Sequence, residues 1–169
     1  MPERLATALL GKLRLIWLAM CGSVIIFGVV LSIVEPRSGG DVELVPFVLL
    51  AAAIGVTVAV FVVRRIFFGP SLGLFLVREP HDPEPLSSDD AQRALIQQLA
   101  RFQTGFLVAL ALSESVALFG FISSFLSNDL GWYLVHATFA LLLMVVQFPR
   151  RPGLLGGLSP AVRRMIEEA

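Results

Sequence analysis

The stretch TGFLVALALSESVALFGFISSFL, residues Thr104–Leu126, decides the class of this protein. Glu114 is its only charged residue, and the other side chains are apolar or small. About 20 residues at ~1.5 Å per residue cover the ~30 Å of bilayer hydrocarbon, so a run of this length is typical of a membrane-spanning helix. A backbone surrounded by lipid must satisfy its own hydrogen bonds, and a helix does so.

Three further apolar runs of similar length lie outward from this stretch: Leu15–Val34, Leu44–Val63 and Leu130–Phe148. The 169-residue chain is 56% hydrophobic and 15% charged, which excludes an ordinary soluble domain. Its net charge of +0 gives no basic field that would indicate a nucleic-acid partner. The sequence therefore predicts an all-α, polytopic membrane protein with four transmembrane helices arranged as two hairpins.

The basic residues predict the orientation of these helices. All except Arg37 fall before the first run, between the second and third, or after the fourth. They are Arg4, Lys12, Arg14, Arg64, Arg65, Arg78, Arg93, Arg101, Arg150, Arg151, Arg163 and Arg164. The positive-inside rule places these intervals, and with them the N- and C-termini, in the cytoplasm. We expect a multi-pass protein of a bacterial inner membrane, with Trp132 and Tyr133 in the outer interfacial belt.

Four segments are expected along the chain. Residues 1–68 form the first transmembrane hairpin, and residues 69–88 form a Pro-rich cytoplasmic loop. Residues 89–149 form an amphipathic helix that continues into the second transmembrane hairpin, and residues 150–169 form a cytoplasmic tail with a short helix. The apolar face of the amphipathic helix (Ala91, Leu95, Leu99 and Phe102) is expected to pack on its own protein or on lipid headgroups, with docking of a partner as the alternative.

An internal repeat relates the two halves. Residues 19–34 can be laid on residues 111–126 with six identities in sixteen positions. The identical pairs are Ala19/Ala111, Ser23/Ser115, Val24/Val116, Phe27/Phe119, Gly28/Gly120 and Ser32/Ser124. We interpret the repeat as a duplicated two-helix hairpin.

Small residues recur at every fourth position in two of the runs, which predicts close helix packing. The stripes are Ala51, Gly55 and Ala59 in the second run, and Gly105, Ala109, Ser113 and Ala117 in the third. The third run is therefore expected in the packed interior or at an oligomer interface. We expect a homo-oligomer or a larger membrane complex within the lipid bilayer.

Glu114 is the candidate functional residue, because a charged side chain at the centre of a membrane helix costs about 2.5–3.5 kcal/mol on insertion scales. Desolvation favours the neutral carboxyl, which can donate a hydrogen bond. Ser23, Thr57 and Ser115 lie at about the same depth and are its expected partners. These four residues form a candidate ion-binding site, with a proton as the candidate ligand. The alternative, held about equally, is a carboxyl that only links helices.

The segment Ala111–Gly120 resembles the carboxylate-bearing helix of the c subunit (proteolipid) of rotary ATP synthases. In that family a membrane carboxylate, followed by a small residue and an aromatic–Gly pair, binds the translocated ion. Glu114 matches the carboxylate, Ser115 the small residue, and Phe119 and Gly120 the pair. The resemblance implies a proton-binding helical hairpin. The chain departs from the family in the forty-residue interval before the third run.

Four functional classes compete. We favour a non-enzymatic structural or accessory subunit of a membrane assembly, in which Glu114 stabilises helix contacts. The alternatives are a proton-binding proteolipid or small proton-coupled transporter that uses Glu114, a sensor acting through its cytoplasmic loop, and an enzyme. The enzyme is least favoured, because no nucleophile–base pair, metal-ligand cluster or Gly-rich phosphate loop stands out. No cofactor and no metal are expected.

Overall fold

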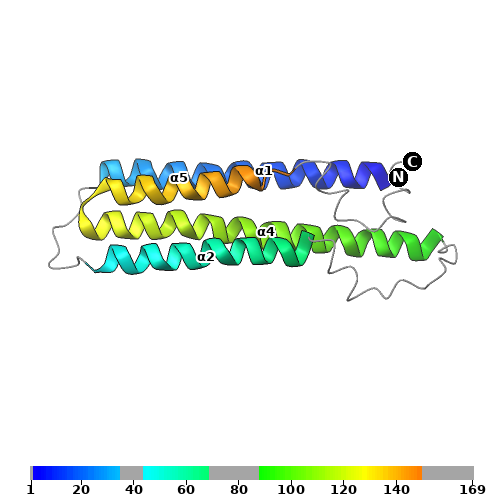
Figure 1. Ribbon diagram of the computed structural model, residues 1–169. Coiled ribbons are helices and arrows are strands. Elements are labelled where there is room, and N and C mark those ends of the chain that lie inside the picture. The colour runs from blue at the N-terminus through cyan, green and yellow to red at the C-terminus, as the bar shows by residue number, and fades with distance from the viewer. Residues whose placement is uncertain (1, 35–43, 69–87, 150–169) are drawn as a thin grey trace.

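The computed structural model describes residues 2–34, 44–68 and 88–149, which form four helices (Figure 1). They are α1 (Pro2–Ile33), α2 (Val45–Phe68), α4 (Ser88–Ser127) and α5 (Leu130–Val146). The described part of the chain is all-α, as predicted. The expected outer turn at residues 35–43, the Pro-rich loop at 69–87 and the short helix in the tail lie outside the described residues.

Three of the helices are long and apolar enough to cross a membrane. These candidate spans cover Thr7–Ile33 in α1, Val45–Phe67 in α2 and Leu95–Ser127 in α4. The fourth helix, α5, is apolar but has 17 residues, or about 26 Å at ~1.5 Å per residue. It ends before the expected limit at Phe148. Pro149 follows that residue, and a proline disfavours the helical conformation of the residue before it.

Helix α4 runs without a break for 40 residues, so the predicted amphipathic segment continues directly into the third span. At ~1.5 Å per residue the helix is about 60 Å long and extends beyond the end of α2 (Figure 1). Leu95, Leu99 and Phe102 are buried in the same apolar cluster as Leu10 and Leu13 of α1. The apolar face therefore packs within its own chain.

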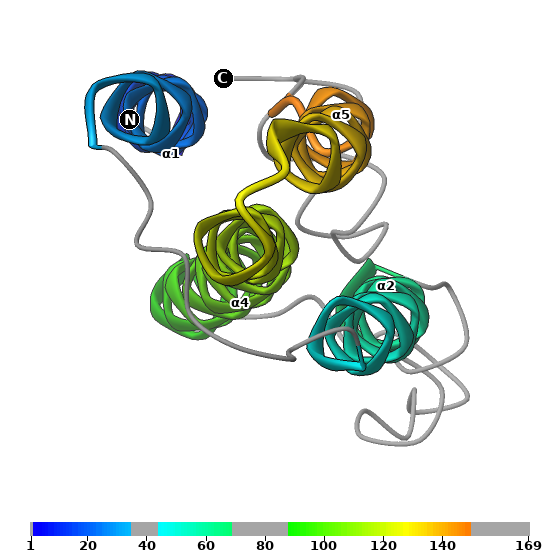
Figure 2. The same cartoon turned by 90° about the vertical axis from the view of Figure 1, so that its left-hand side faces the viewer.

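Helix α4 is the central helix of the bundle. In an apolar 18-residue stretch of its candidate span, 44% of the residues are buried, against 11% for α1 and 17% for α2. It packs against each of the other three helices, and α1 and α2 lie on opposite sides of the α4–α5 pair (Figure 2). The expected first hairpin is thus not a tightly packed pair in the described residues.

The two small-residue stripes differ in their surroundings. On α4, Ala109, Ser113 and Ala117 are fully or almost fully buried. Gly105 is also buried, and a Cβ there would lie 2.5 Å from Cβ of Phe67 on α2. The glycine therefore permits the close approach of α2 to α4.

Most of the stripe on α2 lies on the outer face of the bundle, so the close packing predicted for it is not seen within the chain. Ala51 and Gly55 are exposed and Ala59 is half-buried. The buried positions of α2 are instead Ala53 and Val60. Small residues permit close approach but do not drive it, because lipid is as apolar as the bundle interior.

Equivalent glycines of the internal repeat have similar surroundings. A Cβ at Gly28 of α1 would meet the ring of Tyr133 at 2.9 Å. A Cβ at Gly120 of α4 would collide with Cβ of His136. Both glycines therefore let side chains of α5 lie against the backbones of α1 and α4. The duplication itself stays a prediction.

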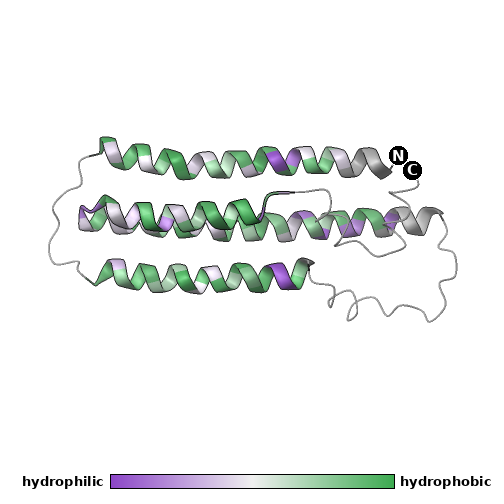
Figure 3. Cartoon of the chain, turned by 45° about the horizontal axis from the view of Figure 1, so that its top comes forward, coloured by the Kyte–Doolittle hydropathy of each residue, from purple (hydrophilic) through white to green (hydrophobic). Residues whose placement is uncertain are grey.

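The two ends of the bundle differ in charge. The hydrophilic turns of α1 and α2 lie at one level along the bundle, towards the end where α1 and α4 begin (Figure 3). We call this the basic end, because every described basic side chain lies there: Lys12, Arg14, Arg64, Arg65, Arg93 and Arg101. The opposite end carries Asp129, which caps α5 by accepting a hydrogen bond from Gly131 N at 2.8 Å.

Candidate functional site

A hydrogen bond between Ser23 of α1 and Glu114 of α4 forms the centre of the candidate site. It joins Ser23 Oγ to Glu114 Oε1 across 91 residues of sequence. Both residues are half-buried, and they belong to parallel helices. Counting residues from the ends of the spans predicts this pair, because both residues fall at the same depth.

The surroundings of Ser23 bear on the protonation state of Glu114. Ser23 Oγ also lies 2.7 Å from the backbone oxygen of Met20, which can only accept. A serine hydroxyl carries one proton. Two arrangements satisfy both contacts: Ser23 shares its proton between the two oxygens, or Ser23 donates to Met20 while a protonated Glu114 donates to Ser23.

A second interhelical bond lies beside the first. Ser113 precedes Glu114 on α4 and is fully buried. Its Oγ accepts a hydrogen bond from Gln147 Nε2, at the C-terminal end of α5, at 2.7 Å. Ser113 in turn donates to the backbone oxygen of Ala109 at 2.9 Å. Consecutive residues of α4 thus bind α1 on one side and α5 on the other.

The side chain of Trp17 joins α1 directly to α5. Its Nε1 donates to the backbone oxygen of Met144 at 2.7 Å, and its ring meets Phe148 edge-on at 5.1 Å between centroids. A carbonyl oxygen that accepts a side-chain hydrogen bond is stabilised where water is scarce. We call Trp17, Ser23, Ser113, Glu114 and Gln147 the polar layer, which links α1, α4 and α5.

Two of the four predicted ion-site residues do not reach Glu114. Ser115 Oγ donates to the backbone oxygen of Leu112 at 2.7 Å, and Thr57 Oγ1 donates to that of Ala53 at 2.8 Å. Each hydroxyl therefore bonds within its own helix. Helix α2 contributes no described side-chain hydrogen bond to the polar layer, so the layer is narrower than the predicted four-residue site.

Two buried polar atoms near the opposite end have no described partner. His136 Nδ1 lies 2.7 Å from the backbone oxygen of Trp132. Since that oxygen only accepts, Nδ1 carries the proton, and Nε2 of a neutral ring is then an acceptor. Neither His136 Nε2 nor Ser123 Oγ makes a hydrogen bond among the described residues. His136 also makes no bond to Glu114, which the difference in depth predicts.

Tyr133 departs from the expected interfacial belt. It is 4% exposed, and its hydroxyl donates to the backbone oxygen of Val24 on α1. Trp132 is half-buried and packs edge-on against Phe47 of α2, with ring centroids 5.4 Å apart. Tyr133 therefore joins α5 to α1 within the bundle. A single sequence does not distinguish such a buried tyrosine from an interfacial one.

The chain matches no family model, no curated protein and no solved structure. Within residues 2–34, 44–68 and 88–149 no group of three or more His, Cys, Asp or Glu side chains could hold a metal ion. The site must therefore be interpreted from its own geometry.

Sequence reasoning missed the contributions of Trp17, Gln147 and Tyr133 to helix contacts. Each of the three is a side chain with a polar tip within or beside an apolar run, and this feature could have predicted their hydrogen bonds. Such a side chain needs a hydrogen-bond partner when it is buried.

Proposed function

We propose that this chain is a non-enzymatic integral membrane protein, a structural or accessory subunit of a membrane assembly. Its Glu114 serves as a neutral hydrogen-bonding group that fixes α1 against α4. The Ser23–Glu114 hydrogen bond carries the proposal. Its geometry suits a carboxyl that donates, and a neutral carboxyl avoids most of the cost of a charge within the hydrocarbon.

The rest of the polar layer supports a structural role. A transport site needs space for its ion and access to both sides of the membrane, whereas the polar groups around Glu114 bond helix to helix. The Ser113 hydroxyl accepts a hydrogen bond from Gln147, and the Trp17 indole donates one to the backbone oxygen of Met144. Ser115 and Thr57 bond their own backbones. These contacts favour fixed helix positions over a binding cavity.

Purification of the full chain in a mild detergent, in the wild-type form and as Glu114→Gln, tests the proposal. A structural subunit retains its assembly in the Gln variant, because an amide can still donate to Ser23. Ser23→Ala should weaken the assembly, because it removes the acceptor. If Glu114→Gln disrupts the assembly while Ser23→Ala preserves it, the carboxyl has a role that the hydrogen bond does not explain.

The second candidate is a proton-binding proteolipid or small proton-coupled transporter. Two observations favour it: Glu114 is only half-buried, and its segment resembles the c-subunit helix. The neighbouring exposed residues Ala111 and Leu118 face outward from α4. A carboxyl at the edge of a lipid-facing surface is open to exchange with a partner subunit.

Labelling with a hydrophobic carbodiimide separates the two candidates. The reagent modifies a protonated carboxyl that is open to the membrane. Labelling of the folded chain that protons or sodium ions compete away supports the ion-binding function. Labelling only after unfolding supports the structural function.

We further propose that the protein is an inner-membrane protein in which α5 also crosses the bilayer and both termini are cytoplasmic. The positive-inside rule supports this sidedness, because all described basic side chains gather at the basic end. A reporter that works only in the cytoplasm should be active when it is fused to either terminus, and one that works only outside the cytoplasm should be inactive there.

A further inference from the structure

The basic end carries positive charge without a described negative counterpart. Within the described side chains the only acids are Glu114 and Asp129. Glu114 lies thirteen residues from Arg101 along α4, or about 20 Å at ~1.5 Å per residue, and Asp129 lies at the opposite end. None of the basic side chains at this end has a described ion-pair partner. Their charge is therefore available to an external anion.

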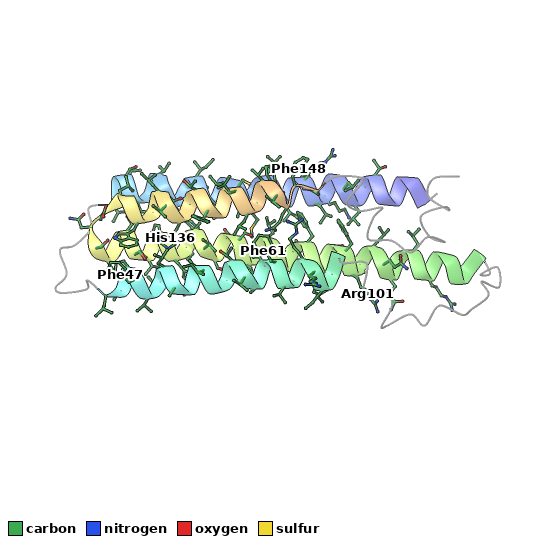
Figure 4. All side chains as sticks on the ribbon, in the orientation of Figure 1. Phe47, Phe61, Arg101, His136 and Phe148 are labelled. Carbon is green, nitrogen blue, oxygen red and sulfur yellow. The ribbon has the colours of Figure 1, made fainter. Side chains whose placement is uncertain are left out.

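Arg64 and Arg101 lie where α2 and α4 meet, and Arg65 follows Arg64 on the exposed face of α2. The contact between Phe67 and Gly105 fixes the relative position of these antiparallel helices. Arg64 and Arg65 precede Phe67 by three and two residues, and Arg101 precedes Gly105 by four. Figure 4 shows Arg101 beside the end of α2. Along the bundle axis, Arg65 and Arg101 are about 9 Å apart at ~1.5 Å per residue.

This spacing is similar to the depth of a phospholipid headgroup layer. A bilayer of about 40–45 Å with a core of about 30 Å has headgroup regions about 5–8 Å thick on each side. Arginine binds phosphate oxygens through two parallel N–H donors, and its side chain can extend from a helix end towards the headgroups. Arg64 and Arg101 can therefore approach the phosphate of one lipid from two helices, and Arg65 adds positive charge beside them.

Apolar side chains next to these arginines favour a lipid over a soluble anion. Phe61 and Val62, three residues before Arg64 and Arg65 and so nearer the membrane core, are 56% and 50% exposed. A ligand that binds here meets guanidinium groups at its headgroup and apolar side chains towards the membrane core. Only an amphiphilic anion matches both features.

Arg14 of α1 is less available. Arg14 Nε donates to the backbone oxygen of Pro149 at 3.5 Å, and its guanidinium lies 5.7 Å from the centre of the Phe148 ring. Arg14 is thus engaged by α5 and the residues that follow it. Arg64, Arg65 and Arg101 make no hydrogen bond or ion pair with the described residues.

We propose that the junction of α2 and α4 at the basic end binds the headgroup of an anionic phospholipid. Arg64 and Arg101 are its phosphate ligands, Arg65 adds positive charge beside them, and Phe61 and Val62 contact the acyl chains. This site is distinct from the polar layer, so a failure of lipid binding would leave the proposed role of Glu114 unaffected.

Binding of phosphatidylglycerol to the full chain in detergent, measured by native mass spectrometry at ~0.15 M salt, tests the proposal. Phosphatidylcholine is the neutral comparison, and inorganic phosphate is the soluble one. We expect a clear preference for phosphatidylglycerol. Arg101→Gln should weaken its binding about fivefold, and the double variant Arg64→Gln/Arg65→Gln about 25-fold, from ~1 kcal/mol per basic residue.

Arg93→Gln is the matched control. Arg93 is an exposed arginine on α4, eight residues or about 12 Å beyond Arg101, and so outside the headgroup layer. The control should bind phosphatidylglycerol as the wild type does. If Arg93→Gln and Arg101→Gln weaken phosphatidylglycerol binding equally, the lipid is attracted by the overall positive charge and the proposed site is wrong.

Two other outcomes would also overturn the site. Equal binding of both phospholipids would exclude a role for the headgroup charge. Displacement of the lipid by inorganic phosphate at similar concentration would identify a soluble-anion site instead. Thermal unfolding of each variant without lipid shows whether its fold is intact.

Discussion

Removing one partner of the Ser23–Glu114 hydrogen bond should have an effect that depends on which partner is removed. Ser23→Ala leaves the Glu114 carboxyl without its described partner in an apolar setting. Glu114→Gln leaves Ser23 bonded to the Met20 backbone oxygen at 2.7 Å, and the new amide can still donate to Ser23. The two substitutions therefore differ in the polar groups that they leave unsatisfied.

The expected magnitudes follow from this difference. Interhelical hydrogen bonds within membranes contribute about 0.6 kcal/mol on average and ~1.7 at most. An unsatisfied buried polar group costs about 1–3 kcal/mol. Because Glu114 is half-buried, we expect Ser23→Ala to lower the free energy of unfolding by about 1–2 kcal/mol, in the lower part of that range. Glu114→Gln should lower it by less than about 0.5 kcal/mol.

Reversible unfolding of the full chain in mixed detergent micelles, followed by tryptophan fluorescence, measures both values. Ser32→Ala is the matched control, since Ser32 is an exposed serine of α1 that donates to the Val29 backbone oxygen at 2.7 Å, as Ser23 does to Met20. Ser32→Ala should change the free energy of unfolding little. In a Glu114→Leu background the cost of Ser23→Ala should fall to within about 0.5 kcal/mol of zero. If Ser23→Ala lowers the free energy of unfolding as much in that background as in the wild type, or if Glu114→Gln lowers it more than Ser23→Ala does, the two side chains are not coupled as proposed.

Two further predictions concern close contacts in the bundle. Gly105→Ala should destabilise the chain by about 1–3 kcal/mol in the same unfolding assay, because its Cβ would lie 2.5 Å from Cβ of Phe67. Gly55→Ala has open space around it and should be neutral or slightly stabilising; equal effects of the two would contradict the α2–α4 packing. Nitrogen-15 NMR of His136 should show the proton on Nδ1, bonded to the Trp132 backbone oxygen, and a protonated Nε2 in a neutral ring would contradict this assignment.

The sequence predicts the helices better than it predicts their mutual packing. The length and hydropathy of the apolar runs predict α1, α2 and α4, and the spacing of Leu95, Leu99 and Phe102 predicts the buried face of α4's first turns. These features depend on local composition and periodicity. The shorter extent of α5 follows from Pro149, a signal that hydropathy alone does not weigh.

The rotation of each helix about its axis is the main feature that the sequence does not predict. Residue counting places both Ser23 and Thr57 at the depth of Glu114, yet only Ser23 reaches it. In a soluble bundle, polar faces would mark the outside of each helix. Here lipid and the bundle interior are both apolar, so hydropathy does not distinguish the two faces. The same ambiguity explains why Ala51 and Gly55 of α2 face outward.

The proposed structural role requires Glu114 to be a neutral carboxyl that donates a hydrogen bond to Ser23. Infrared difference spectroscopy between the wild type and Glu114→Gln, near neutral pH in lipid, tests it most directly. We expect the carbonyl stretch of a protonated carboxylic acid in the wild type only, and a shift of that band in Ser23→Ala, where the hydrogen bond is lost. A difference spectrum that contains only carboxylate bands, or an acid band that Ser23→Ala leaves unmoved, would contradict the claim.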